Sequence, residues 1–309
     1  MAFAFLFPGQ GSQSLGMMDG FAELPVVRET FDEASRVLGE DLWAMLGAPT
    51  ADAINATVNT QPVMLTAGVA VWRAWQARGG QLPVALAGHS LGEYTALVAA
   101  GALAFEDALR LVRLRAVAMQ EAVPEGAGAM AAILGLDDES IRAACAETAQ
   151  GEVVEAVNFN SPGQVVIAGG KAAVERAMEA CKTRGAKRAL PLPVSVPSHC
   201  ALMRPAADRL AAALADVIIH TPVINVTHNV DVTCHEEPDA IRDALVRQLY
   251  SPVRWTETVA ALAGGGITRM AECGPGKVLA GLAKRIDGNV KCFALTDMAA
   301  MDAALAELA

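Results

Sequence analysis

The chain has 309 residues, of which 53 % are hydrophobic and 19 % are charged, and its formal net charge at pH 7 is −10. This composition is typical of a globular protein with a sizeable core and argues against a disordered chain. The acidic balance argues against nucleic acid as the main partner, because a basic footprint is missing. It does not exclude a local basic patch.

The sequence shows no pattern typical of a membrane span or a signal peptide. Its most hydrophobic region, residues 82–105, is interrupted by His89, Glu93 and several glycines. The apolar residues 1–7 lack the basic start of a signal peptide. Six scattered cysteines without a C-x-x-C pair favour reduced thiols and suggest neither zinc nor disulfides. We therefore expect a cytoplasmic protein that binds no metal.

The first element that we predict is a short apolar strand at residues 3–7. The loop after it contains Gly9 and Gly11, but it fits neither nucleotide-binding template. Its glycine spacing is not that of a Rossmann motif, and no Gly-Lys-Ser/Thr follows. We expect these glycines to permit a close approach to the segment beside the first strand. Helices are then predicted at residues 25–38 and 61–78, the second apolar nearly all round.

The segment around Ser90 has the pattern of a nucleophile elbow. An apolar run precedes Gly88-His89-Ser90-Leu91-Gly92, and an apolar helix is predicted after it, to about residue 100. The glycines allow a tight turn that presents the serine hydroxyl at the start of the helix. There the free N–H groups and the helix dipole are able to stabilise an oxyanion. The alternative is an incidental serine in a glycine-bounded turn, but the strand–turn–helix context favours catalysis.

The helix predicted at residues 105–121 carries a cation in an unexpected place. Arg110 and Arg113 fall on its solvated face, whereas Arg115 projects into the apolar stripe beside Met119. A buried arginine without a partner is strongly destabilising. Arg115 must therefore face either a carboxylate of the protein or a bound anion, and this helix alone leaves both readings open. Its position shortly after the elbow helix favours the anion.

A self-contained pattern of strands and helices begins after Pro124. Its order of strand, helix, strand, strand, helix and strand is that of a ferredoxin-like unit. Asp137-Asp138 caps the first helix, and residues 160–163 form the turn between the middle strands. We predict a small subdomain over residues 125–196, inserted into a large domain formed by residues 1–124 and 197–309. Its strands are predicted at residues 130–136, 153–158, 164–168 and 186–192, and its helices end near residues 148 and 184.

The chain returns to the large domain through residues 190–199, which contain three prolines and are therefore rigid and extended. Strands that alternate with helices on both sides of the insert indicate an α/β domain with a mostly parallel sheet. The later strands are predicted at residues 223–227, 268–273 and 290–295, and the helices at 203–215, 239–249, 256–263, 278–286 and 297–308.

A serine nucleophile needs a base, and histidine is the usual one. His199 is our first candidate, because it lies on the proline-rich turn at the re-entry point, a place suited to a cleft. His89 is adjacent to Ser90, but its side chain should point away, so we expect it to pack or to orient. No acidic third member stands out, and the residues alone leave the choice of base open. The remaining histidines, His220, His228 and His235, have no distinguishing context.

A set of short segments is spread along nearly the whole chain. They are FPGQGSQ (7–13), NTQP (59–62), GHSLGE (88–93), Arg115, NFNSPGQ (158–164), VPSH (196–199), QL (248–249), PVRW (252–255) and GPG (274–276). Together and in this order, they closely resemble the malonyl-CoA:acyl-carrier-protein transacylases of bacterial type II fatty-acid synthesis. The resemblance implies a hydrolase-like α/β domain with a ferredoxin-like insert, in agreement with the predicted elements.

The resemblance also implies roles for individual residues. Ser90 would be the acylated nucleophile and His199 its base. The backbone carbonyl of Gln248 would orient the imidazole, which explains why no acidic third member stands out. The backbone N–H groups of Gln10 and Leu91 would form the oxyanion hole.

The implied reaction is ping-pong transfer of a malonyl group from malonyl-CoA, through Ser90, to the phosphopantetheine thiol of acyl carrier protein. Arg115 would pair with the free malonyl carboxylate, which a planar guanidinium binds well. The resemblance implies a monomer without a permanently bound cofactor, with the CoA thioester as substrate. Acyl carrier protein is acidic, so we expect a cationic docking site, although ordinary solvated charge is the alternative for each residue. The candidates are Lys182, Arg184, Lys187 and Arg188, together with Lys284 and Arg285.

Three alternatives stay open. A serine esterase or thioesterase of similar fold would not need the Arg115 cation in its acyl pocket. An acyltransferase for another extender unit, such as methylmalonyl, would differ in pocket volume, which the sequence does not show. A binding or scaffold protein with a vestigial pocket is disfavoured by the presence of Ser90, His199 and Arg115 together.

Overall fold

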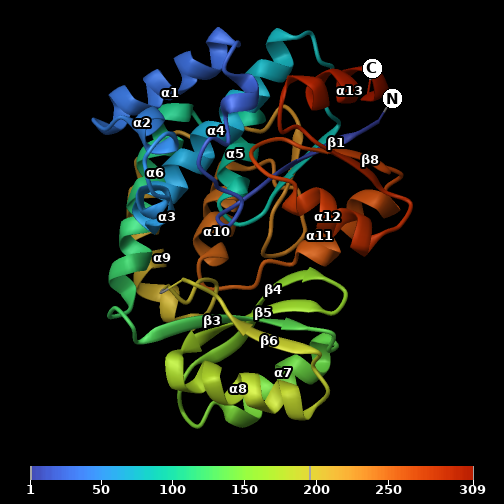
Figure 1. Cartoon of the computed structure of the whole chain (residues 1–309). Coiled ribbons are helices and arrows are strands. Elements are labelled where there is room, and N and C mark those ends of the chain that lie inside the picture. The colour runs from blue at the N-terminus through green and yellow to red at the C-terminus, as the bar shows by residue number, and fades with distance from the viewer. Residues whose placement is uncertain (1, 195, 309) are drawn as a thin grey trace.

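The structure is a computed structural model that describes residues 2–194 and 196–308. These residues form two β-sheets, which lie one above the other in Figure 1 with helices packed against each. The chain leaves the upper part after α6 (Phe105–Ala122) and returns to it just before α9 (Arg204–Ala215). The lower part is therefore built from one continuous stretch of sequence.

The larger sheet has five parallel strands in the order β7-β2-β1-β8-β9. It confirms the predicted α/β class. Four of the strands are one or two residues shorter than their sequence patterns predict, because the end residues pass into loops. The strands are β1 (Ala4–Phe7), β2 (Ala85–Gly88), β7 (Asn225–Thr227), β8 (Arg269–Glu272) and β9 (Lys291–Ala294).

The first strand shows why this sheet is covered on both faces. Phe3, Phe5 and Phe7 point into one core, and Ala4 and Leu6 into another, because successive side chains of a strand point to opposite faces. The phenylalanine side is covered by α1 (Pro25–Leu38), α2 (Leu42–Leu46), α4 (Thr57–Ala77), α5 (Gly92–Ala99), α6, α9, α10 (Pro238–Gln248) and α13 (Met298–Leu308). The other side is covered by α11 (Trp255–Gly264) and α12 (Val278–Ile286).

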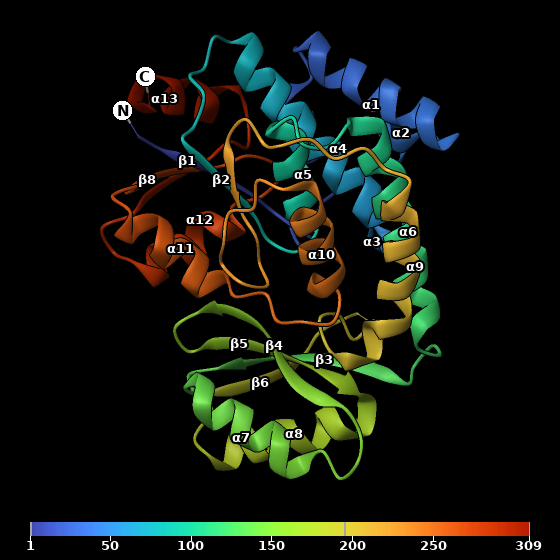
Figure 2. The ribbon, with the colours of Figure 1, turned by 180° about the vertical axis from the view of Figure 1, so that it is seen from behind.

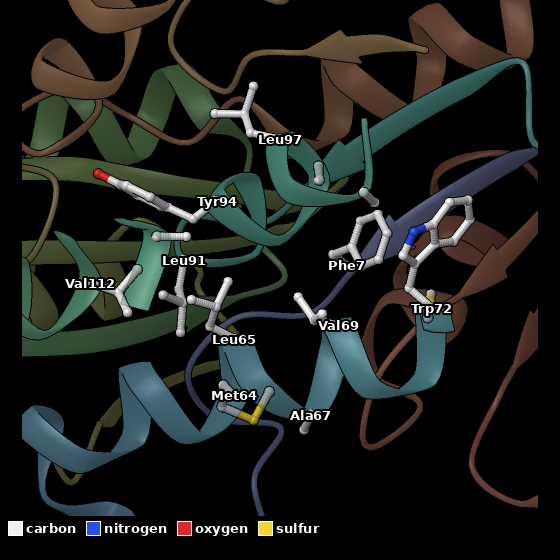
Figure 3. Packing of buried hydrophobic residues seen from close by; sticks show 14 of the residues in the cluster. Phe7, Met64, Leu65, Ala67, Val69, Trp72, Leu91, Tyr94, Leu97 and Val112 are labelled. Carbon is white, nitrogen blue, oxygen red and sulfur yellow. The ribbon is translucent and has the colours of Figure 1, made fainter. Parts of the chain in front are cut away.

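The long helix α4 is buried nearly all round, as its apolar composition predicts. In Figure 3 its Leu65 lies near Leu91, which precedes α5, and other α4 side chains lie near Phe7 of β1. The helix begins at Thr57, four residues before the predicted start. The Thr60 hydroxyl donates to a carbonyl of the preceding short helix α3 (Asp52–Asn55), which ties the additional turn in place.

The smaller sheet has four antiparallel strands in the order β4-β5-β3-β6. Together with its helices it has the predicted ferredoxin-like order along the chain. Figure 2 shows α7 and α8 below this sheet, with which they share a separate core. The boundaries at residues 124/125 and 196/197 stay a prediction. The elements are β3 (Gly128–Leu134), α7 (Asp138–Thr148), β4 (Val154–Ser161), β5 (Gln164–Gly170), α8 (Lys171–Thr183) and β6 (Arg188–Pro191).

Two local features of this part test the sequence patterns. Asp137 is the N-cap of α7, and its carboxylate accepts a hydrogen bond from the Ser140 N–H at 2.8 Å. The predicted turn is too long, because β4 continues to Ser161 and only Pro162-Gly163 connects the strands. Gly163 has a φ of 70°, and this left-handed conformation favours glycine.

The return segment runs from β6 past Val194 and Val196 to His199, and Ser195 lies outside the described residues. A short 3₁₀ turn, η2 (Ala201–Met203), then leads into α9, and another, η1 (Asp19–Phe21), precedes α1. Within the described ranges, no helix is both long and apolar enough to cross a bilayer.

Candidate active site

A cavity of about 120 Å³ lies at the carboxyl ends of β1 and β2, where the smaller sheet faces the larger domain. Ligand sites of open α/β sheets commonly lie at this end of the strands. The larger domain contributes Gln10, Ser90 and Arg115, each from a different segment, and the smaller sheet contributes Met130 and Asn158. The fold therefore brings residues far apart in the sequence into one space.

The turn at Ser90 is as tight as its glycines require. A Cβ atom on Gly88 would lie 1.9 Å from the carbonyl carbon of Gly92, and one on Gly92 would lie 2.0 Å from the carbonyl oxygen of Phe7. Ser90 has a φ of 52°, a left-handed conformation that costs an L-residue about 1–2 kcal/mol. Strain of this kind is concentrated at functional sites. The elbow therefore holds Ser90 in a conformation that a relaxed turn would not adopt.

We expect Gly92→Ala to lower the free energy of unfolding by about 3 kcal/mol, because the backbone of β1 would have to move away. Urea denaturation measures the change. Gly288→Ala is the control: a Cβ atom there meets nothing within 4 Å, so its effect should stay within about 0.5 kcal/mol. Equal stability of the two variants would contradict the close approach of the elbow to β1.

Ser90 and His199 form a short hydrogen-bonded relay. The distance from Ser90 Oγ to His199 Nε2 is 2.7 Å, and His199 Nδ1 lies 2.7 Å from the carbonyl oxygen of Gln248. A carbonyl oxygen only accepts, so Nδ1 carries the hydrogen and Nε2 is free to accept the Ser90 proton. The His199 backbone N–H also donates to the Leu249 carbonyl at 3.0 Å. The end of α10 thus holds both the backbone and the ring of the base.

The environment of His199 keeps its imidazole neutral. The residue is 3 % exposed, and its φ of 65° is also left-handed. The pKa of His199 is lowered to about 3, mainly because burial disfavours the charged ring and secondly because the positive charge of Arg115 lies nearby. At pH 7 the ring is therefore unprotonated and able to act as a base.

The Arg115 guanidinium is buried beside the serine. Its Nη2 lies 3.1 Å from Ser90 Oγ and 3.0 Å from Gln248 Oε1, and its Nη1 lies 2.8 Å from Gln61 Oε1. Burial lowers the pKa of Arg115, but an arginine stays protonated at pH 7. Among the described residues, only neutral groups accept hydrogen bonds from it. Of the two readings left open by the helix pattern, this favours a bound anion over a structural ion pair.

Two backbone N–H groups border the same cavity. Gln10 and Leu91 line it, and neither N–H donates to any group of the described residues. Leu91 is the N-cap of α5, so the positive end of that helix lies at this point. The loop with Gln10 approaches closely because Gly9 has no side chain: a Cβ atom on Gly9 would lie 2.5 Å from the His89 carbonyl oxygen. This is the close approach expected of the glycine loop.

Three further polar residues lie in or next to the cavity, and of these only His89 was given a role from the sequence, to pack or to orient. His89 points away from the serine as expected: its Nε2 lies 2.9 Å from Asn160 Oδ1, and its ring packs on Trp255. Gln61 accepts from Arg115 and directs its Nε2 at the Met119 sulfur, 3.6 Å away. Gln61 and Asn160 both lie in segments that carry the family resemblance, and those segments are the only sequence signal for them.

Two of the cationic candidates for docking, Arg188 of β6 and Arg285 of α12, lie at one end of the smaller sheet. Gln164 of β5 and Arg188 of β6 both pair with Leu134 of the central strand β3, so they lie at the same level of the sheet. Arg285 donates a hydrogen bond to Gln164 Oε1 at 2.7 Å. Lys187 and Lys284 are exposed next to these arginines in the sequence. The other two candidates, Lys182 and Arg184, are paired with Glu179 and Glu147.

Comparison with known proteins identifies the family. Residues 4–285 match the model of the acyl transferase domain. The malonyl CoA-acyl carrier protein transacylases of Salmonella typhimurium and Escherichia coli K12 are 60 % and 61 % identical to the chain, over 99 % and 98 % of both sequences in each pair. A malonyl-transacylase solved with its type II polyketide-synthase acyl-carrier protein matches with a TM-score of 0.98 at 57 % identity, covering 99 % of this chain and 100 % of that one. The acyl-carrier-protein S-malonyltransferase of Burkholderia pseudomallei matches with a TM-score of 0.97 at 60 % identity, over the same shares. The chain therefore belongs to the acyl transferase family, in the group of the malonyl CoA-acyl carrier protein transacylases.

Proposed function

We propose that the protein transfers a malonyl group from malonyl-CoA to the phosphopantetheine thiol of an acyl carrier protein. One observation carries the choice of acyl group. The buried Arg115 cation lies 3.1 Å from Ser90 Oγ and has only neutral partners among the described residues. A malonyl thioester brings a free carboxylate to this point, and a guanidinium binds a carboxylate with two parallel hydrogen bonds.

In the first half-reaction, His199 Nε2 takes the Ser90 hydroxyl proton while Oγ bonds to the thioester carbonyl carbon. The carbonyl oxygen becomes an oxyanion, which the N–H groups of Gln10 and Leu91 stabilise. The C–S bond then breaks, and the imidazolium returns its proton to the CoA sulfur. The Gln248 carbonyl accepts from Nδ1 throughout and stabilises the charged ring.

In the second half-reaction, the phosphopantetheine thiol of the carrier protein gives its proton to His199 Nε2 and attacks the malonyl-serine ester. The same two N–H groups stabilise the second oxyanion. The C–O bond to Ser90 breaks, and the proton passes to Oγ. Both half-reactions use one oxyanion site and one base, so the two thiol substrates must bind in turn, which is ping-pong kinetics.

This chemistry needs no resident cofactor, because the CoA thioester itself supplies the activated acyl group. A serine esterase would use the same relay without needing a cation beside the nucleophile, so Arg115 favours transfer of an acidic acyl group. We further propose that the protein acts in the cytoplasm as a monomer. All six cysteines lie in the described ranges as free thiols, which suits a reducing compartment.

The direct test is an incubation with malonyl-CoA and holo acyl carrier protein. We expect malonyl carrier protein and free CoA, and only slow transfer when acetyl-CoA replaces malonyl-CoA. Release of free malonate without loading of the carrier would identify a hydrolase instead.

The pH dependence of the first half-reaction follows from the base. kcat/KM reports the ionisations of the free enzyme, and the pKa of His199 is lowered to about 3. Loss of the neutral base on acidification should therefore begin only far below pH 6.5, and kcat/KM for malonyl-CoA should stay level from about pH 8 to about pH 5. The low pKa of His199 also affects stability. As the pH falls below about 6.5, the unfolded chain binds a proton at His199 before the folded protein does, so the free energy of unfolding decreases.

Stopped-flow acylation rates at graded pH check this expectation. If the acylation rate fell to half its plateau value near pH 6.5, the ordinary histidine pKa, the result would contradict the burial of the base. Removal of the positive charge in Arg115→Gln should move the acidic limb to higher pH, because that charge is the second cause of the low pKa.

The docking proposal also has a separate test. We expect Lys187→Glu combined with Arg188→Glu to raise the KM for acyl carrier protein about tenfold, because the acidic partner would be repelled. Transfer to free pantetheine, which has no protein surface, should be unchanged. Lys182→Glu is the matched control, since that lysine is already paired with Glu179. A KM for the carrier that is insensitive to the double change would remove these residues from the docking surface.

A further inference from the structure

We propose that Asn229 is a positioning residue for the nucleophile: its side-chain amide continues the β2–β7 ladder past the end of β7 and fixes the peptide that carries Ser90. The inference rests on the proposed function, because it concerns the rate at which Ser90 is acylated. It concerns a residue outside all the motifs quoted for the resemblance.

The side chain of Asn229 makes two hydrogen bonds to the elbow. Its Oδ1 accepts from the Ser90 N–H at 2.7 Å, and its Nδ2 donates to the Gly88 carbonyl at 2.7 Å. The backbone pairing of β2 with β7 ends at Ala87 and Thr227. The amide therefore provides the acceptor and the donor that the backbone of one further β7 residue would have provided. Asn229 is fully buried, so water does not compete for these bonds.

This bridge selects which N–H groups remain for the reaction. The Ser90 N–H is engaged by Asn229, whereas the Leu91 N–H has no acceptor among the described residues. The bridge also fixes the peptide groups on either side of His89, because it bonds to the Gly88 carbonyl and to the Ser90 N–H. It therefore opposes any relaxation of Ser90 out of its left-handed conformation. Loss of the bridge should therefore move Oγ relative to His199 Nε2 and to the oxyanion site.

Asn229 is itself held by a buried carboxylate on the elbow helix. Glu93 lies in the first turn of α5 and is fully buried. Its Oε2 accepts from the Asn229 N–H at 3.0 Å and from Gln248 Nε2 at 3.0 Å, and its Oε1 accepts from His228 Nδ1 at 2.7 Å. The Asn229 carbonyl accepts from the Arg254 N–H at 3.2 Å. One carboxylate thus ties the bridging loop and the end of α10 to the helix that begins at the nucleophile.

The first test is Asn229→Ala, followed by rapid mixing with malonyl-CoA and quantification of the malonyl-enzyme. We expect the acylation rate to fall about 100-fold, with the KM for malonyl-CoA within about threefold of the wild-type value, because Asn229 does not line the cavity. Thr30→Ala is the control. Thr30 is equally buried and its hydroxyl is hydrogen-bonded, but it lies on α1, so it should lose stability without losing acylation rate.

Asn229→Asp is the second test and keeps the shape of the side chain. A carboxylate still accepts from the Ser90 N–H but cannot donate to the Gly88 carbonyl, whereas a protonated carboxyl does both. The acylation rate, divided by that of the wild type, should therefore rise as the pH is lowered. The charged and titratable groups of the elbow, of this loop and of the residues bonded to them are His89, Glu93, Tyr94, Arg115, His199, His228, Asp231, His235, Arg247 and Arg254. They are the same in both proteins, so the ratio isolates the introduced group.

The possible results distinguish a failure of the positioning role from a failure of the proposed function. If Asn229→Asp has a pH profile parallel to the wild type, or if both variants acylate at the wild-type rate, the positioning role is wrong. If Asn229→Ala does not fold, the profile of Asn229→Asp decides. If the wild-type protein itself forms no malonyl-enzyme, the proposed function fails rather than this inference.

Discussion

Ser90→Ala should reduce malonyl transfer to acyl carrier protein by about 10⁵-fold. The hydroxyl accepts the acyl group in both half-reactions, and no described group in the cavity replaces it beside His199 Nε2. Binding of malonyl-CoA should persist, because Arg115 and the cavity walls remain. Steady-state transfer, measured as free CoA released per enzyme, gives the rate, and equilibrium binding of malonyl-CoA shows that the site is intact.

The matched control for this change is Ser161→Ala. The Ser161 side chain is buried, and its hydroxyl has no partner among the described residues, so its removal should leave transfer within about twofold and stability nearly unchanged. Retention of full activity by Ser90→Ala would show that another group carries the acyl chain and would overturn the mechanism.

Arg115→Ala should lower kcat/KM for malonyl-CoA by about 10³-fold while changing transfer of acetyl groups far less. The malonyl carboxylate would then enter a buried site that offers no cation. An acetyl group has no such charge to desolvate, so the preference between the two thioesters should collapse. Competition between malonyl-CoA and acetyl-CoA for one pool of carrier protein measures the ratio directly.

Arg113→Ala provides the control on the same helix. Arg113 is two residues away and makes two 2.8 Å hydrogen bonds to Glu40, remote from the serine. Its removal should leave the malonyl preference intact. An unchanged preference in Arg115→Ala would remove the guanidinium from acyl recognition and reopen the esterase interpretation.

Features with a local cause were predictable from the sequence. The elbow could be predicted, because a strand, two glycines and a helix surround Ser90 within a dozen residues. The buried position of Arg115 could be predicted too, because helical periodicity alone places it in the apolar stripe. The ferredoxin-like order of the small subdomain could be predicted as well, because each of its strands and helices has its own pattern and turn signal. Helix α4 began earlier than predicted, since its additional turn depends on a hydrogen bond to another helix.

Features that depend on folding were not predictable from the residues alone. Among five histidines, His199 is distinguished by the end of α10, which holds both its ring and its backbone. The partner of its ring is a backbone carbonyl, and every residue type has one. The Asn229 side chain bonds to Ser90 across 139 residues of sequence, and the Asn229 backbone N–H bonds to Glu93 across 136 residues. Only the family resemblance pointed to Gln248, and nothing pointed to Asn229.

The central claim is that Ser90 carries the malonyl group between two thiols. Intact mass spectrometry of the protein, first mixed with malonyl-CoA and then with holo acyl carrier protein, tests it most directly. The account predicts that the protein gains one malonyl group, located on Ser90 by peptide mapping, and that the added mass moves to the carrier protein in the second step. Malonyl carrier protein formed without any covalent malonyl-enzyme, or with the group on another residue, would contradict it.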